Sequence, residues 1–487
     1  MALEVFNTLG HRRQLFQPLQ PGFVGIYVCG PTVYDHPHIG HAKSYVSFDV
    51  IVRYLRAIGN RVRYVQNITD VGHLTDDADQ GEDKILRRAS LDRVEPMELV
   101  ETYTRSYLED MDALGNQRPN IMPRASAHIP EQIELVERLL ERGFAYVVNG
   151  SVYFSVAKFP GYGKLSGRRP EELREGARLE VNPDKRDPLD FALWKRAEPG
   201  HILRWRSPWG WGFPGWHLEC SVMSTKYLGQ PFDIHGGGLE NQFPHHESEI
   251  AQSEAATGLL FCNYWLHNNM VTVNGQKMGK SLGNAIFLKD LFKRYRPLTV
   301  RYFVLNSHYR SPLDFSDEAL ASAERGLQRL HNAVRSLRQA QTSAGPGEVR
   351  PAVAAMLEDA RCAFMKAMDD DFNTASALAT LFDLARESNS LLAEGAPTLS
   401  EILALDSLFR QLGHDILGVL PDEFEGTASA GLEPALLQIL IDLRQQARAN
   451  RQWAQADAIR DRLAAIGVKL EDKPEGTTYR IEASTGA

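Results

Sequence analysis

Cysteine is scarce in this sequence, with four among 487 residues: Cys29, Cys220, Cys262 and Cys362. Folds that depend on a disulfide framework are short and rich in cysteine, so this chain is not of that kind. We expect a reducing, cytoplasmic location. A special cysteine in such a chain serves as a metal ligand or in catalysis.

Long apolar runs are also missing. No stretch of about 18 apolar residues is present, so we expect no membrane-spanning helix. The start, "MALEVFNTLGHRRQ", lacks the apolar core of a signal peptide. The net charge of −8 argues against bulk, non-specific binding of nucleic acid, but it leaves room for a local basic face. The length predicts two to four domains.

The clearest local pattern is strand, helix, strand. "FVGIYVCG" is rich in β-formers and predicts a strand. Residues 37–59 repeat apolar side chains at helical spacing, with Pro37 in the first turn and Gly59 beyond the last. "RVRYVQNIT" predicts a second strand. Such a unit predicts an α/β fold with a parallel sheet, whose ligands bind beyond the carboxyl ends of the strands. Cys29 and the following "HIGH" stretch lie at such an end.

Further elements follow along the chain. Residues 95–205 read mostly as helices with a short β-like "AYVVNGSVYF", and we interpret them as an insertion into the sheet domain. "DIHGGG" is a short strand before a helix that Pro244 opens and Gly258 closes, and "VTVNGQKMGKSLGN" reads as a polar loop. From about 316 the pattern is helical, interrupted by the linker-like "QTSAGPGEVRP" and "PDEFEGTASAGLEP".

His38 and His41 stand three residues apart at a predicted helix start. They share one face there, beside backbone N–H groups that we expect to be free and the positive end of the helix dipole, while Gly40 leaves room for a ligand. This arrangement predicts a phosphate site. The alternative is a pair of solvated or capping histidines. Neither a G-x-G-x-x-G fingerprint nor a P-loop follows the first strand.

The stretch "KMGKS" places Lys277 and Lys280 on a glycine-containing loop. Lysine is a compact charge suited to phosphate, although such a loop alone is more often a solvated turn. A His-Ile-Gly-His helix start followed over 200 residues later by this loop is a specific combination.

With these motifs, nearly the whole sequence resembles the cysteinyl-tRNA synthetases, a family of class I aminoacyl-tRNA synthetases. The resemblance includes "FNTLG", "YVCGPTVYDHPHIGHA", "YVQNITDV", "WGFPGWHLECS", "DIHGGGLENQFPHHESEIAQS", "HYRSPLDFS", "DDDFNTASAL" and the segment 447–480. It implies a Rossmann-like catalytic domain over 1–315 with a connective insertion at about 95–205 and the lysine loop in 270–315. A helical bundle over 316–420 and an anticodon-recognition domain over 433–487 would follow.

The resemblance also implies the nucleotide site. The family's HIGH motif falls on 38–41 and its KMSKS loop on 277–281, with Gly279 in place of serine. Catalytic roles fall to His38, His41, Lys277 and Lys280. ATP, with Mg²⁺, would lie against His38, Gly40, His41, Gly236, Gly237, Gly238 and Lys280.

One Zn²⁺ per chain is implied on Cys29, Cys220, His245 and Glu249. The sequence supports part of this set, because His245 and Glu249 are four apart on one helix and so share a face. The ligands are otherwise scattered, and ordinary buried cysteines are the alternative for both thiols. We expect His246 and Glu247 to be supporting or helix-surface groups.

The implied substrates are L-cysteine, ATP and tRNA-Cys, handled by a monomer without an editing domain. The rest of the cysteine substrate would lie near Gly30, Thr69, Trp216 and Asp233, although Trp216 also fits plain core packing. Five arginines around Trp453 would read RNA, or would form a solvated helix face: Arg444, Arg448, Arg451, Arg460 and Arg462. Two rival functions stay open: a cysteine ligase that passes the adenylate to a small amine, as in mycothiol synthesis, and a non-catalytic RNA-binding descendant of a synthetase.

Overall fold

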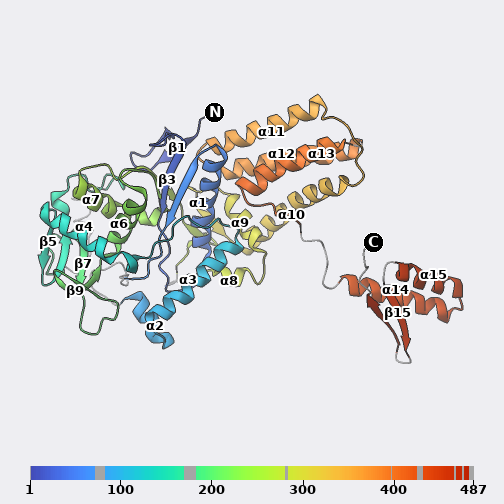
Figure 1. Ribbon diagram of the computed structural model, residues 1–487, viewed down its shortest axis with the longest axis horizontal. Helices are drawn as coiled ribbons and strands as arrows, with labels where there is room; N and C mark the ends of the chain where they lie inside the picture. Colours follow the sequence, from blue (N-terminus) through green and yellow to red (C-terminus); the bar gives the residue numbers. More distant parts are fainter. Residues whose placement is uncertain are drawn as a thin grey trace. The chain divides into compact units, whose positions relative to one another are not determined.

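The computed structural model describes most of the chain, in eight segments: 2–71, 83–168, 182–279, 283–395, 397–424, 432–465, 468–473 and 476–481. The chain divides into two compact units, Met1–Asp422 and Glu423–Ala487 (Figure 1). The division falls inside the segment 421–434 that the sequence predicts as a linker. Among the described residues, no helix is long and apolar enough to cross a membrane.

A four-stranded parallel sheet forms the centre of the first unit. Its order is β11-β10-β3-β4, with bounds Cys262–Asn268, Phe232–Gly238, Phe23–Val28 and Arg61–Gln66. The predicted strand–helix–strand unit is therefore confirmed. Strand β10 is buried along its whole length, as expected where helices cover both faces of a parallel sheet.

Helices cover the two faces of this sheet. On one face, α1 (Ile39–Ala57) packs Phe48 against Gly236 of β10. On the other, α6 (Trp216–Leu228) packs Leu228 against Gly25 of β3. Helix α7 runs over His245–Thr257, between Pro244 and a left-handed Gly258, as predicted. Helix α1 is capped by His38, so Pro37 lies before the cap and not in the first turn.

The insertion differs from its prediction. Helix α2 (Lys84–Asp92) precedes it. The insertion contains the helices α3 (Pro96–Ala113), η2 (Ala125–His128), α4 (Ile129–Glu141) and η3 (Val156–Lys158), and also a five-stranded antiparallel sheet. The order of that sheet is β5-β6-β7-β9-β8, with bounds Ala145–Val148, Ser151–Phe154, Phe191–Arg196, Gly210–Pro214 and Trp205–Ser207. The β-like "AYVVNGSVYF" is confirmed as the hairpin β5–β6, and more of the described residues of 95–205 lie in helices than in strands, but β7, β8 and β9 were not predicted. The strands are three to six residues long, and β7 pairs with a strand far earlier in the sequence, so local periodicity does not show it.

The segment 270–315 is also more ordered than a loop. Strands β12 (Val271–Val273) and β13 (Gln276–Lys277) form a hairpin, and β12 pairs in parallel with β14 (Leu313–Phe315). Two short helices lie between them, α8 (Leu288–Leu291) and α9 (Pro297–Leu305). Near the start of the chain, β1 (Glu4–Asn7) pairs with β2 (Arg12–Leu15), and η4 (Leu239–Gln242) follows β10.

Helices dominate from residue 317, as predicted. They are α10 (Asp317–Ala340), α11 (Pro351–Asp369), α12 (Thr374–Glu394), α13 (Leu399–Phe409) and the π-helical η6 (Arg410–Ile416), and Figure 1 shows α10 to α13 as a bundle. The predicted break at 341–351 separates α10 from α11. The second unit contains α14 (Leu432–Ala449), α15 (Trp453–Ala465) and the hairpin β15 (Val468–Lys473) with β16 (Gly476–Ile481). Its core joins Leu437, Leu463 and Val468.

Candidate active site and metal centre

A cavity of about 440 Å³ opens at the carboxyl ends of β3 and β10, where ligands bind in parallel sheets. It is lined by the start of α1, the start of α6, the segment after β10 and the β13 region. The sequence-predicted residues that line it are Cys29, Gly30, His38, Gly40, His41, Thr69, Trp216, Cys220, Gly237, Gly238, His245 and Lys277.

His38 and His41 form a reciprocal cap at the start of α1. His38 Nδ1 accepts the Gly40 N–H at 3.1 Å, and His41 Nδ1 accepts the His38 N–H at 3.1 Å. A ring that accepts at Nδ1 carries its proton on Nε2 when it is neutral. Both imidazoles are therefore fixed in the tautomer that donates from Nε2. The capping alternative and the phosphate prediction are thus compatible.

The backbone N–H groups at this helix start are not free, contrary to the prediction. Ile39 donates to Ile286 O at 2.9 Å, Gly40 to His38 Nδ1, and His41 to His38 O at 2.9 Å. The loop that follows "KMGKS" supplies the acceptor to Ile39. Donors to a phosphate here must therefore come from the histidine Nε2 atoms and from lysines, assisted by the helix dipole.

The glycines divide into two groups. A Cβ on Gly238 would crowd Glu240 of the cavity wall, and one on Gly40 would lie 2.9 Å from the His38 ring and 3.2 Å from Met278 Cε. Gly237 also lines the cavity, but a Cβ there would lie 2.8 Å from the buried His246. Gly236 does not line the cavity: a Cβ there would overlap Phe48 of α1. The prediction of a nucleotide contact at Gly236 is therefore wrong, and helix–sheet packing explains this glycine.

The lysine loop adjoins the same cavity. Lys277, Met278 and Gly279 line it, while Lys280, predicted as a phosphate donor, lies outside the described residues. The sequence did not point to a further lysine, Lys43 of α1. It is buried and donates to the carbonyl oxygens of Met270 and Ser311, which precede and follow the lysine loop in the sequence. Burial lowers the pKa of Lys43 to about 8.

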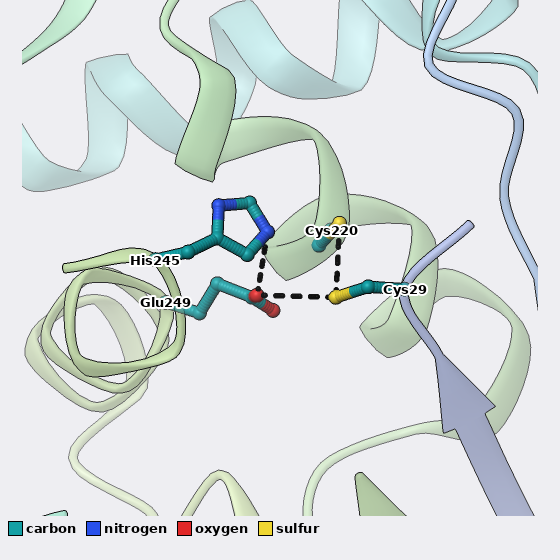
Figure 2. Close-up of side chains that lie close together, drawn as sticks. All are labelled: Cys29, Cys220, His245 and Glu249. Carbon is teal, nitrogen blue, oxygen red and sulfur yellow. Dashed lines mark hydrogen bonds and ion pairs between the residues drawn. The ribbon is translucent and has the colours of Figure 1, made fainter. Parts of the chain in front are cut away.

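Figure 2 shows four side chains from distant segments that converge: Cys29, Cys220, His245 and Glu249. The first three line the cavity. Cys29 Sγ lies 3.9 Å from Cys220 Sγ and 3.8 Å from Glu249 Oε1, and His245 Nε2 lies 3.1 Å from Glu249 Oε1. Donor atoms around a tetrahedral Zn²⁺ lie roughly 3.3 to 3.8 Å apart, from bond lengths of about 2.0 to 2.3 Å. The spacing of the cluster fits one small divalent cation.

Charge points to the same conclusion. Burial raises the pKa of the Cys29 thiol well above its usual range, raises that of Cys220, and raises the pKa of Glu249 to about 8. Three acidic groups so close together in a buried place cannot all ionise on their own. A cation between them would offset the free-energy cost of ionising three neighbouring buried groups. Two thiols with an imidazole and a carboxylate are a donor set that suits zinc.

Beside the cluster lies a set of buried histidines: His246, predicted as a supporting group, and His235 and His267, which the sequence did not point to. His235 Nε2 bonds Glu249 Oε2 at 2.8 Å, and His246 lies 3.2 Å from Cys29 Sγ and 2.8 Å from His267 Nε2. Cys29, His235, His246 and Glu249 also satisfy the spacing of a metal cluster. Buried partners of this kind orient metal ligands. Their only sequence signal is "HH" at a helix start.

The helix-surface interpretation of His246 and Glu247 is wrong, since both are fully buried. Glu247 accepts the N–H groups of Leu165 and Ser166 at 3.1 and 2.9 Å. It therefore fixes the segment at 165–166 against α7.

Of the predicted substrate residues, Gly30, Thr69 and Trp216 line the cavity and Asp233 does not. The carboxylate of Asp233 accepts the N–H groups of Leu19 at 2.6 Å and Gly25 at 2.8 Å, near the opposite end of β10. The prediction for Asp233 is therefore wrong. Two carboxylates line the cavity among the described residues: the half-buried Asp35 and the exposed Glu240, in the turn after the three glycines.

The comparisons with known proteins agree with this geometry. A family model described as the tRNA synthetases class I (C) catalytic domain matches residues 15–325. The structure of a Mycobacterium tuberculosis methionyl-tRNA synthetase with methionyl-adenylate shares the fold, with a TM-score of 0.61 at 15% identity over 82% of this chain and 92% of that one. The fold and the cavity at the strand ends thus define a class I aminoacyl-tRNA synthetase.

The remaining comparisons are more specific. A DALR domain matches 363–421, and a cysteinyl-tRNA ligase anticodon binding domain matches 433–480. Curated cysteine–tRNA ligases of Chlorobium luteolum and Thermus thermophilus are 55% and 54% identical, covering 98% and 99% of this chain and 99% and 100% of their own length. The chain belongs to the cysteine–tRNA ligase family.

Proposed function

We propose that this protein activates L-cysteine with ATP and transfers it to the 3′ end of tRNA-Cys. One observation carries the proposal: two thiols, an imidazole and a carboxylate, spaced to hold one metal ion, lie at the same cavity as the His38–His41 helix start. The first suits a thiol substrate and the second a triphosphate. The bundle and the C-terminal unit supply surfaces for a large RNA.

Activation needs positioning more than proton transfer. The carboxylate of cysteine is already a nucleophile and attacks the α-phosphorus of ATP, releasing pyrophosphate. The Nε2–H groups of His38 and His41, with Lys277 and Lys280, stabilise charge on the phosphoryl oxygens. Mg²⁺ accompanies the triphosphate. Gly40, Gly237 and Gly238 leave room for the adenosine.

Cys29, Cys220, His245 and Glu249 would hold the metal, which we propose is zinc. Serine differs from cysteine by one atom, and an apolar pocket rejects such an analogue poorly. When bound, zinc favours a thiolate over a hydroxyl and so distinguishes the two amino acids. Gly30, Thr69 and Trp216 enclose the rest of the substrate, and Glu240 presents a negative charge suited to its ammonium group.

In the second step, the cysteinyl group passes to the terminal ribose of the tRNA. We assign reading of the anticodon to residues 433–487, where Trp453 is 58% exposed. Arg444 is 5% exposed, so this arginine supports the core of the unit and does not contact RNA. Since charged tRNA serves translation, we place the activity in the cytoplasm, and we expect a monomer.

Charging of a tRNA-Cys transcript with radiolabelled cysteine tests the proposal. We expect charged tRNA, together with cysteine-dependent pyrophosphate exchange and about one zinc per chain by elemental analysis. Exchange without charging would favour the small-amine cysteine ligase. Loss of both would favour a non-catalytic RNA-binding protein. Full activity in a zinc-free preparation would refute the selectivity mechanism.

A further inference from the structure

Lys43 lies on helix α1, two residues after His41, and does not itself line the cavity. Only 1% of its surface is exposed. Its ammonium group donates to the carbonyl oxygen of Met270 at 3.3 Å and to that of Ser311. Burying a charged group costs free energy that an apolar side chain of the same length would not cost. The two hydrogen bonds offset that cost and join α1 to two distant segments.

The two acceptors stand where two paired strands begin. Met270 directly precedes β12, and Ser311 lies two residues before β14, which pairs with β12 in parallel. The Leu313 N–H donates to the Met270 carbonyl at 3.1 Å, so the two segments are also bonded to each other. Strand β12 continues through a turn into β13, which ends at Lys277. Lys43 therefore holds the base of the hairpin that carries the first lysine of the loop.

The segment that contains Ser311 is itself held in place. The buried carboxylate of Asp371, before α12, accepts the Tyr309 hydroxyl at 2.9 Å and the Nε–H of Arg310 at 2.6 Å. The Ser311 carbonyl is thus on a fixed piece of backbone. A bond from Lys43 to this carbonyl fixes the distance between α1 and the hairpin base.

Helix α1 also holds the other end of the lysine loop. The Ile39 N–H donates to Ile286 O at 2.9 Å, and the Leu288 N–H donates to Pro37 O at 2.9 Å. These bonds lie after the loop in the sequence, whereas the Lys43 bonds to the Met270 segment lie before it. The helix that presents the histidine pair therefore sets where both ends of the loop lie.

We propose that Lys43 is a positioning residue for the activation step, whose charge fixes the base of the lysine loop and so sets how far Lys277 reaches toward the phosphates of ATP. The inference rests on the proposed function. His38 and His41 donate to the same phosphates, so the rate depends on the distance between the histidines and the loop. A displacement of about 1 Å between groups that act together can lower a rate on the order of 100-fold.

The charge of Lys43 gives the proposal a pH signature. Among the described residues, Glu240 of η4 is the charged group whose field acts on Lys43, and it favours the ammonium form. Burial has the opposite and larger effect and lowers the pKa of Lys43 to about 8. The ammonium form is present below pH 8 and is lost as the pH rises through 8. An arginine at this position would stay charged throughout.

Kinetics of cysteine-dependent pyrophosphate exchange test this. Lys43→Met keeps the length of the side chain without its charge, and it should lower kcat by about 10- to 100-fold at pH 7. The KM for cysteine should stay within about twofold and the zinc content should not change, because Lys43 contacts neither site. Lys43→Arg should keep kcat within about threefold at pH 7. Between pH 7 and 9, the kcat of the wild type should fall relative to that of Lys43→Arg by up to about tenfold, as the charged fraction of Lys43 does.

Lys158→Met is the matched control, because Lys158 also donates to a backbone carbonyl, that of Gly143 at 2.6 Å, but within the insertion. It should exchange normally. An unchanged kcat in Lys43→Met would overturn the proposal, and so would a joint loss of kcat, zinc and cysteine affinity, which indicates a merely structural role. A pH profile that Lys43→Arg shares with the wild type would also overturn it. Thermal midpoints identify a variant that fails to fold, in which case the other variant decides. Absence of exchange in the wild type would instead refute the proposed function.

Discussion

Cys220 and Cys262 are both buried thiols, yet only Cys220 belongs to the metal cluster. Cys220→Ser removes a thiolate ligand, and the loss should exceed the 10- to 100-fold drop that follows removal of an outer partner of a metal site. We therefore expect metal affinity to fall by at least about 100-fold and the KM for cysteine in pyrophosphate exchange to rise with it. Elemental analysis and exchange kinetics measure the two effects.

Cys262→Ser is the control, because Cys262 belongs to no candidate metal cluster and its Sγ lies 3.5 and 3.4 Å from the carbonyl oxygens of Asp233 and Tyr264. It should keep its zinc and its exchange rate. Equal metal loss in both variants would mean that the cluster is not the metal site.

Gly30 allows a close approach between the ends of β3 and β4, since a Cβ there would overlap the carbonyl oxygen of Asn67. Backbone cannot move aside as a flexible side chain can. Gly30→Ala should destabilise the first unit by about 3 kcal/mol or more and disturb the cavity wall. Gly200→Ala, which meets nothing within 4 Å, should leave the thermal midpoint and exchange unchanged. A fully stable and active Gly30→Ala would contradict the geometry.

The site residues differ in how far the sequence could identify them. The spacing of His245 and Glu249 predicts a shared helix face, which the structure confirms. Cys29 and Cys220 came only from the family resemblance, because ligands from separate strands and helices leave no local signal. Asp233 was likewise assigned from the resemblance alone, and it lies near the amino end of β10, away from the cavity at the carboxyl ends of the strands.

Helix α13 begins with a reciprocal cap that also secures the loop before α11. The Thr398 hydroxyl accepts the Glu401 N–H, and Glu401 accepts the Thr398 N–H and pairs with Arg350 at 2.7 Å. The hydrogen bond from Arg350 lowers the pKa of Glu401 to about 2. A depressed carboxyl pKa contributes stability that is present above about pH 4.5 and is lost as the pH falls toward 2.

Glu401→Gln should therefore lower the free energy of unfolding by about 1 to 2 kcal/mol at pH 7, and the difference from wild type should shrink between pH 4.5 and 2. Urea denaturation at pH 7, 4 and 3 measures this. Glu358→Gln, an exposed carboxylate paired with Arg361 three residues along α11, should cost little at any pH. If the loss of unfolding free energy in Glu401→Gln did not change with pH, the charge of Glu401 would not be what stabilises the fold.

Elements with strong local signals were predictable, and elements defined by distant partners were not. Strand β3, helix α1 and strand β4 form a unit of periodic apolar residues, and Pro244 with Gly258 delimit α7. The insertion sheet pairs β6 with β7 across 36 intervening residues, and its strand β8 has three residues. Neither property produces a periodic pattern, so β7, β8 and β9 were not predicted, whereas the hairpin β5–β6 was.

At the scale of the whole molecule, the cavity and the C-terminal unit belong to different compact units of the chain. The described cavity residues all belong to Met1–Asp422, which has its own core clusters, while Leu437, Leu463 and Val468 form a separate core in Glu423–Ala487. The linker composition at 421–434 predicted this division. The boundary between 1–315 and 316–420 stays a prediction, since both lie in one compact unit.

A chain that ends at Asp422 therefore tests the division of labour. It should fold, bind zinc and catalyse cysteine-dependent pyrophosphate exchange within about twofold of the full chain, because no described residue of the cavity is removed. Charging should fall on the order of 100-fold in kcat/KM for tRNA, because two linked binding surfaces lose avidity of that size when one is deleted. Charging of a tRNA minihelix that lacks the anticodon arm is the control, and it should be equal for the two proteins. Undiminished charging of full-length tRNA by the shortened chain would remove the C-terminal unit from RNA recognition, and loss of exchange would show that the first unit depends on the second.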